Sequence, residues 1–143
     1  LSFERIYLGS PRQSAYALTR LRQLAEKMGA AEDPLFSDRY ARHRADLEDL
    51  KALYARYVEV LKQGRPLGAD VSQLKVIQSE LFQRITETAL EVAGENAALF
   101  GPMEGNRNLN PGALYIQARP TTIYGGTNEI QRNIISKNVL ELP

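Results

Sequence analysis

The amino-acid sequence predicts an all-α protein folded as an up-and-down four-helix bundle. Three observations favour this class: apolar residues recur at spacings of three and four over long segments, strand-like alternation is scarce, and the connections are short enough to join antiparallel neighbours. A length of 143 residues suits one domain, residues 1–143, which is large enough to bury a stable core.

The first helical segment is expected at about 2–28. Leu18, Leu21 and Met28 belong to an apolar stripe at helical spacing. Pro11 lacks a backbone N–H and follows a glycine and a serine, so the segment should kink or break at that point.

The second segment has the most regular pattern in the chain. Ser37 is expected to cap it, and Asp38 lies in the first turn, where a negative charge favours the helix dipole. Apolar residues recur every seven positions from Tyr40 onward, and a glycine and a proline follow Gln63. A helix should therefore end near Gln63, and His43 on this helix is expected to be packed in the interior or in an interface.

The third segment should begin near Asp70, its expected cap, and end near Gly94. A short helix at 111–118, an extended stretch at 121–124 and a final helix at 127–140 should follow. The buried face of the final helix is expected to carry Ile130, Ile134, Ile135 and Val139.

Composition excludes several classes of site and partner. The chain has no cysteine and one histidine, which excludes a disulfide scaffold, a thiolate zinc site, a cysteine nucleophile and a multi-histidine metal site. Eighteen basic residues against seventeen acidic ones give a net charge of +1, which argues against nucleic acid and anionic membrane surfaces as partners. No apolar run is long enough to predict a membrane span.

The most specific string is residues 122–135, Thr-Ile-Tyr-Gly-Gly-Thr-Asn-Glu-Ile-Gln-Arg-Asn-Ile-Ile, and the chain closes with Leu-Glu-Leu-Pro at 140–143. It resembles the C-terminal signature of flavin-dependent acyl-CoA dehydrogenases. Residues 1–5 resemble the start of the first helix of the family's C-terminal domain, and residues 74–81 resemble part of its third long helix. The resemblance implies a C-terminal helical-bundle domain of a longer enzyme, without that enzyme's N-terminal helical and middle β domains.

The resemblance also implies an activity. Family enzymes are FAD-dependent oxidoreductases of lipid and fatty acid metabolism that dehydrogenate an acyl-CoA substrate between its α- and β-carbons. Such enzymes are homo- or hetero-oligomers, dimers or tetramers, and pass electrons to an electron-transfer flavoprotein or a similar acceptor. We expect a cytoplasmic enzyme in a bacterium, or a mitochondrial-matrix enzyme in a eukaryote, and we expect the isolated domain to self-associate and to lack activity.

The resemblance points to a catalytic base on the first helix. Many members carry the base just before the Gly-Thr of the terminal motif, where this chain has Gly125. Members with Gly-Gly-Thr carry it in a Glu-Arg pair on the first helix, and Glu4-Arg5 matches that pair. Glu4 is therefore the expected base, while the backbone N–H of Gly125 is expected to bind the thioester carbonyl oxygen.

The same motif suggests the other site residues. Arg5 and Tyr124 are expected to contact substrate, and Gly126, Thr127 and Glu129 are expected to contact FAD at the start of the last helix. Each has an ordinary structural interpretation as well: a surface arginine, a packed tyrosine, a helix cap.

One departure from the family pattern and two alternative interpretations of the chain stay open. The family's Arg-x-x-Phe-Gly element, whose arginine reaches the FAD of a neighbouring subunit, is absent, and Lys27 or Arg39 could replace it. Glu4 could be a surface residue near a helix start, in a non-catalytic subunit that assembles with an active one. The chain could also be a stand-alone helical interaction module.

Overall fold

The structure, a computed structural model, describes residues 2–99 and 101–142. Leu1, which opens the first predicted motif, and Pro143, which closes the last, lie outside the described residues. The described chain contains helices and no strand, as predicted, and none of its helices is both long enough and apolar enough to cross a membrane. The α-helices are α1 (Ser2–Leu8), α2 (Arg12–Lys27), α3 (Pro34–Lys62), α4 (Ser72–Ala93), α5 (Pro111–Ala118) and α6 (Asn128–Asn138).

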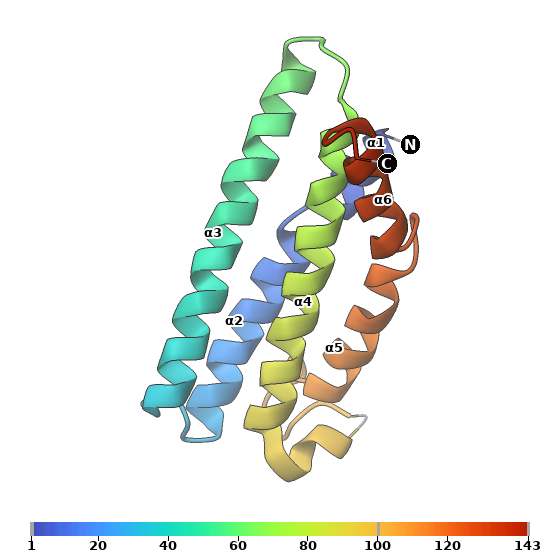
Figure 1. Cartoon of the computed structure of the whole chain (residues 1–143). Coiled ribbons are helices and arrows are strands. Elements are labelled where there is room, and N and C mark those ends of the chain that lie inside the picture. Colours follow the sequence, from blue (N-terminus) through green and yellow to red (C-terminus); the bar gives the residue numbers. More distant parts are fainter. Residues whose placement is uncertain (1, 100, 143) are drawn as a thin grey trace.

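Helices α2, α3 and α4 run up and down beside one another, and α5 and α6 return along the other side of α4 (Figure 1). Three short 3₁₀ segments join them: η1 (Ala69–Val71), η2 (Gly94–Ala98) and η3 (Arg119–Thr122). Helices α1 and α6 lie at the same end of the bundle, near both chain termini (Figure 1). The predicted bundle is confirmed, and its topology brings the first and last motifs of the sequence together.

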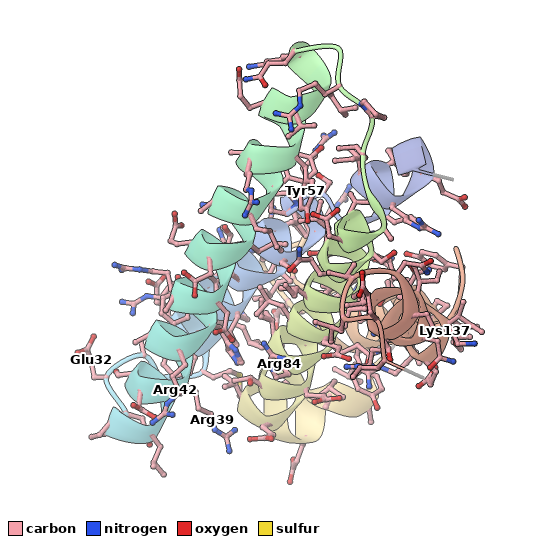
Figure 2. The ribbon with its side chains drawn as sticks, turned by 45° about the horizontal axis from the view of Figure 1, so that its top comes forward. Glu32, Arg39, Arg42, Tyr57, Arg84 and Lys137 are labelled. Carbon is pink, nitrogen blue, oxygen red and sulfur yellow. The ribbon has the colours of Figure 1, made fainter. Side chains whose placement is uncertain are left out.

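Helix α4 is the centre of the bundle, because it packs against α1, α2, α3, α5 and α6. Its Leu74, Leu81 and Ile85 are fully buried, as are Leu21 of α2 and Leu50 of α3. Burying each such side chain contributes roughly 1.5–3 kcal/mol. The charged side chains Arg39 and Arg42 of α3 are exposed, and Arg39 extends toward α4, where it pairs with Glu91 (Figure 2).

Two predicted helix starts are corrected. Helix α3 begins at Pro34 and not after Ser37, because Asp33 caps it: its carboxylate accepts hydrogen bonds from the backbone N–H groups of Leu35 (2.7 Å) and Phe36 (3.2 Å). A proline at the first helical position is well suited to that start. Asp70 does not cap α4.

Asp70 instead accepts a hydrogen bond of 2.7 Å from the Tyr57 hydroxyl. It lies within η1, and α4 begins two residues later with Val71 at its cap position and no side-chain cap. The break predicted at Pro11 is confirmed, since α1 and α2 are separate helices.

The stretch at 121–124 is helical and not extended. The Thr121 hydroxyl donates to the backbone oxygen of Ala118 (2.6 Å), and the backbone N–H groups of Ile123 and Tyr124 donate to the oxygen of Pro120. These bonds continue the direction of α5 into η3 and a turn. Threonine and isoleucine suggested a strand, but local hydrogen bonds decide the conformation.

The predicted apolar face of α6 is wrong in detail. Ile130 is 51% exposed and Val139 43% exposed, while Ile134 and Ile135 are half-buried. The buried residues of α6 are polar, Asn128 and Gln131.

Candidate functional site

Two glycines form the loop before α6, and both have backbone conformations that favour glycine. Gly125 has φ +66° and Gly126 has φ +84°. A Cβ atom at position 125 would collide with Leu8 of α1, and one at position 126 would lie 2.7 Å from the Gln131 amide nitrogen. A side chain at position 125 would therefore displace the end of the Leu8 side chain from its place against the loop.

Gln131 fixes the backbone of this loop. Its amide nitrogen donates to the backbone oxygens of Gly125 (2.9 Å) and Gly126 (3.4 Å), and its side chain is fully buried. Sequence reasoning missed this residue. The available signal was a polar residue on the expected inner face of a short helix, six positions after Gly125.

Glu4 lies across from the loop on α1. Its side chain is exposed, and its carboxylate Oε1 is 3.8 Å from the position that a Cβ of Gly125 would occupy. Leu8, one turn further along α1, contacts the same point. The two residues expected to cooperate in proton abstraction and carbonyl binding are thus neighbours in space, although 121 positions separate them in the chain.

Thr127 caps α6, and Glu129 lies in its first turn. The Thr127 hydroxyl oxygen lies 3.3 Å from the N–H of Ile130 and accepts its hydrogen bond. The exposed Glu129 carboxylate accepts hydrogen bonds from its own backbone N–H and from the Thr127 hydroxyl, and these bonds lower its pKa. Part of the donor set at this helix N-terminus is therefore already used within the chain.

Tyr124 lines an open cavity of about 1020 Å³ near the loop. Leu8 borders the same cavity, whereas Glu4, Gly125 and Gly126 do not line it. Arg5, which is half-buried on α1, does not line the cavity. Aromatic rings form much of the wall, from Tyr7, Tyr16, Tyr54, Phe82 and Tyr124.

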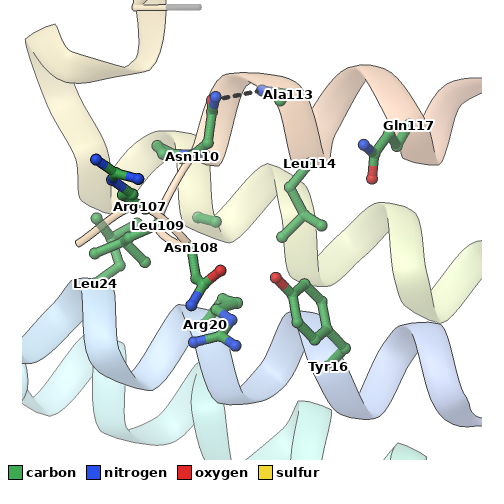
Figure 3. Close-up of a pocket in the computed structure, with 12 residues that line it drawn as sticks. Tyr16, Arg20, Leu24, Arg107, Asn108, Leu109, Asn110, Ala113, Leu114 and Gln117 are labelled. Carbon is green, nitrogen blue, oxygen red and sulfur yellow. Dashed lines mark hydrogen bonds between the residues drawn. The ribbon is translucent and has the colours of Figure 1, made fainter. Parts of the chain in front are cut away.

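A smaller cavity of about 170 Å³ lies between α2, the loop at 107–110 and α5 (Figure 3). Arg20 stacks over the Tyr16 ring (4.6 Å from the centroid) and donates to Gln23 (2.7 Å). Arg20 and Arg107 both line the cavity, but their guanidinium groups do not point toward one another (Figure 3). The two cations therefore do not converge on one ligand position.

The two candidates for the missing family arginine are engaged inside the chain. Lys27 donates to the backbone oxygen of Glu104 (2.6 Å), and Arg39 pairs with Glu91 of α4. Within the described ranges, no group of three or more histidine, aspartate or glutamate side chains is placed to bind a metal ion.

Comparisons with known proteins agree with this geometry. Residues 1–140 match the family model described as "Acyl-CoA dehydrogenase, C-terminal domain". The chain is 34% identical to acyl-CoA dehydrogenase IpdE1 of Mycobacterium tuberculosis, over 100% of this chain and 36% of that protein. It is 33% identical to IpdE1 of Mycolicibacterium smegmatis, over 100% of this chain and 35% of that protein. The chain thus spans about a third of the length of these curated relatives.

Solved structures give the same fold. The steroid ACAD Tcur3481–Tcur3483 superposes with a TM-score of 0.85 at 23% identity, over 100% of this chain and 38% of that one. A chain of the ChsE4–ChsE5 complex from Mycobacterium tuberculosis gives a TM-score of 0.75 at 28% identity, over 94% of this chain and 36% of that one. The chain belongs to the acyl-CoA dehydrogenase family and matches the C-terminal domain of its members.

Proposed function

We propose that this chain is the C-terminal domain of an acyl-CoA dehydrogenase that uses Glu4 as its catalytic base. The observation that carries the proposal is the position of the Glu4 carboxylate opposite Gly125, at a point that Leu8 also contacts. Leu8 and Tyr124 in turn line the open, aromatic-walled cavity. A carboxylate and a backbone N–H donor that face one another are the groups that abstraction of a proton next to a thioester requires.

The chemistry assigned to the chain is a proton transfer. Glu4 takes the α-proton of the acyl-CoA, and the electron pair of that C–H bond forms the new double bond as the β-carbon loses a hydride. FAD, when bound, accepts that hydride. A positioned base of this kind contributes about 10²- to 10⁴-fold to the rate.

Gly125 would bind the thioester oxygen through its backbone N–H. Gln131 holds the carbonyl groups of both glycines and so limits rotation of the two peptide planes that follow Gly125. A donor held in place before the reaction stabilises developing enolate charge, and one such donor is worth roughly 3–4 kcal/mol in comparable sites.

We propose that the start of α6 forms one edge of a flavin site. Glu129 places a negative charge at the helix N-terminus, and the Ile130 N–H is already bonded to Thr127. This end of the helix is therefore unsuited to the cofactor's pyrophosphate. Thr127 and Glu129 instead offer oxygen atoms to a hydroxyl or N–H donor of FAD, and Gly126 would contact the cofactor through its backbone.

A bulky acyl group suits the larger cavity. Its volume of about 1020 Å³ and its aromatic wall fit a broad, apolar substituent better than a short unbranched one. Tyr124 would contact this acyl group, and Arg5 would support the CoA side. One structural neighbour is described as a steroid ACAD, which agrees with a polycyclic acyl-CoA as the substrate class.

A second candidate function is that of a non-catalytic subunit in a hetero-oligomer. Two observations favour it: the family arginine is absent and its candidate replacements are bonded within the chain, and one structural neighbour is a two-chain complex, ChsE4–ChsE5. We infer a hetero-oligomeric enzyme in either case, in the bacterial cytoplasm because the relatives are bacterial, with an electron-transfer flavoprotein or a similar acceptor.

The two functions are separated by Glu4→Gln in the complete protein, purified alone and with its partner subunit. If Glu4 is the base, FAD stays bound while anaerobic reduction of the flavin by acyl-CoA slows by about 10²- to 10⁴-fold. Glu32→Gln, an exposed glutamate in the turn before α3, is the matched control and should reduce normally. Normal reduction in Glu4→Gln would refute the base and favour the non-catalytic subunit.

A further inference from the structure

Lys75 of α4 is a buried lysine below the start of α6. Its side chain is 1% exposed, and its ammonium donates a hydrogen bond of 2.7 Å to the Asn128 side-chain oxygen. Burial lowers the pKa of Lys75, while the carboxylates of Glu129 and Glu80 oppose that shift. Lysine is almost never fully buried unless it is paired, so the contact with Asn128 calls for an explanation.

Asn128 is the first residue of α6 and the centre of a polar cluster with α4. Its oxygen also accepts from the Ser79 hydroxyl (3.2 Å), and its nitrogen lies 3.3 Å from a carboxylate oxygen of Glu80. Glu80 in turn pairs with Arg132, one turn further along α6. The first turn of α6 is thereby bonded to α4 at successive points.

Apolar burial gives this turn little support. Ile130, the apolar residue of the turn, is 51% exposed, whereas Asn128 and Gln131 are 2% and 1% exposed. Hydrogen bonds are directional, and they fix the position of a segment more closely than apolar contact does. The loop at 125–127 joins directly onto Asn128, and Gln131 holds its carbonyl groups.

We propose that Lys75 is a positioning residue, which through Asn128 holds the first turn of α6, and with it the loop at 125–127, in the geometry that faces Glu4. The catalytic role of the loop in this inference rests on the proposed function. The way in which Lys75 and Asn128 hold the loop is independent of that function.

The test uses Lys75→Met in the complete protein. Methionine keeps the apolar stem of the side chain and removes the ammonium. Lys75→Gln is the conservative variant, because it keeps an N–H donor. Lys62→Met, which removes an exposed lysine at the end of α3, is the matched control.

Two readouts are measured on each variant. The first is the rate of flavin reduction per bound flavin, with KM for acyl-CoA followed separately. Lys75→Met should slow reduction by on the order of 10- to 100-fold with a much smaller change in KM, because the reacting groups are misplaced. Lys75→Gln should recover part of the rate, and Lys62→Met should match the unmodified protein.

The second readout is amide hydrogen exchange, which needs no substrate. In Lys75→Met, residues 125–131 should exchange faster while the peptides of α2 and α3 are unchanged. Unchanged exchange at 125–131, a general rise across the bundle, or faster local exchange with an unaltered reduction rate would each overturn the inference. A different outcome separates the two proposals. If acyl-CoA does not reduce the flavin of the unmodified protein, the proposed function is refuted. If Lys75→Met still shows faster exchange at 125–131, the role of Lys75 in holding the loop stands.

Discussion

Helix α4 packs against α2 mainly through apolar side chains, with one buried hydrogen bond from the Ser14 hydroxyl to the Gln78 side-chain oxygen (2.6 Å), and against the first turn of α6 through a cluster of polar side chains. In the apolar core, Leu21 of α2 and Leu74 of α4 are fully buried, and apolar contacts are non-directional. On the α6 side, the ammonium of Lys75 and the side-chain amide of Asn128 are buried together at a hydrogen-bonding distance of 2.7 Å. The first contact stabilises the bundle, and the second fixes the orientation of the loop beside Glu4.

The largest effect is expected where apolar burial carries the stability. Leu21→Ala should lower the free energy of unfolding of the chain by about 2–5 kcal/mol, because a cavity is left at a fully buried site. Ile130→Ala on α6 is the matched change at a residue that is 51% exposed, and it should cost far less. Urea unfolding measures both, and equal costs would remove the distinction between the two sides of α4.

Asn128→Ala should have the next largest effect. It leaves the buried Lys75 ammonium without its hydrogen-bond acceptor, at a cost of about 1–3 kcal/mol or more in unfolding free energy. The double variant that adds Lys75→Met should recover much of this loss, since no buried charge then remains unpaired. Strictly additive losses in urea unfolding would show that the two side chains do not depend on each other.

Gly125→Ala tests how closely the loop approaches α1. The added methyl group collides with Leu8 and sits in a left-handed backbone conformation. Gly29→Ala is the control, because Gly29 has φ +71° but nothing within 4 Å of the added carbon. Gly29→Ala should cost about 1–2 kcal/mol from the backbone alone, and Gly125→Ala should cost more; thermal unfolding of both variants decides this.

The smallest effect concerns His43, which is buried on α3 with its Nε2 2.9 Å from the Thr88 hydroxyl oxygen. Burial lowers its pKa below the ordinary value of 6.5, with Arg84 acting in the same direction. The unfolded chain therefore binds the proton more readily, so stability is full above pH 6.5 and declines as the pH falls below it.

His43→Gln should flatten this part of the stability–pH curve. Because the chain has one histidine, an NMR titration of its imidazole reads the folded-state pKa without overlap. An imidazole that titrates above 6.5 in the folded chain would contradict the prediction.

The fold could be predicted from sequence because its helices rest on apolar periodicity and on glycine and proline breaks. The break at Pro11 and the helix at 111–118 are confirmed. The start of α3 was missed because Ser37 and Asp33 are both good caps, and the proline after Asp33 decides between them. The buried face of α6 differs from the prediction. The spacing of its isoleucines predicts an apolar buried face, whereas the buried side chains are amides.

Prediction of the site from sequence is also limited by buried polar residues. The resemblance to the family pointed to Glu4 and Gly125, and the fold brings them together. The sequence does not predict the roles of Lys75, Asn128 and Gln131. Burial of a polar side chain depends on a hydrogen-bonding partner from another part of the chain, and sequence periodicity does not identify that partner. The sequence held one sign of it: Lys75 stands between Leu74 and Val76, in a stretch of α4 that is buried on most sides.

The central claim is that Glu4 faces the carbon whose proton is removed. The most direct measurement is an experimental structure of the complete protein with FAD and a non-reactive acyl-CoA analogue. We expect the Glu4 carboxylate about 3–3.5 Å from the analogue's α-position, with the Gly125 N–H on the thioester oxygen. A different carboxylate at the α-position, or an analogue bound away from Glu4, would contradict the account.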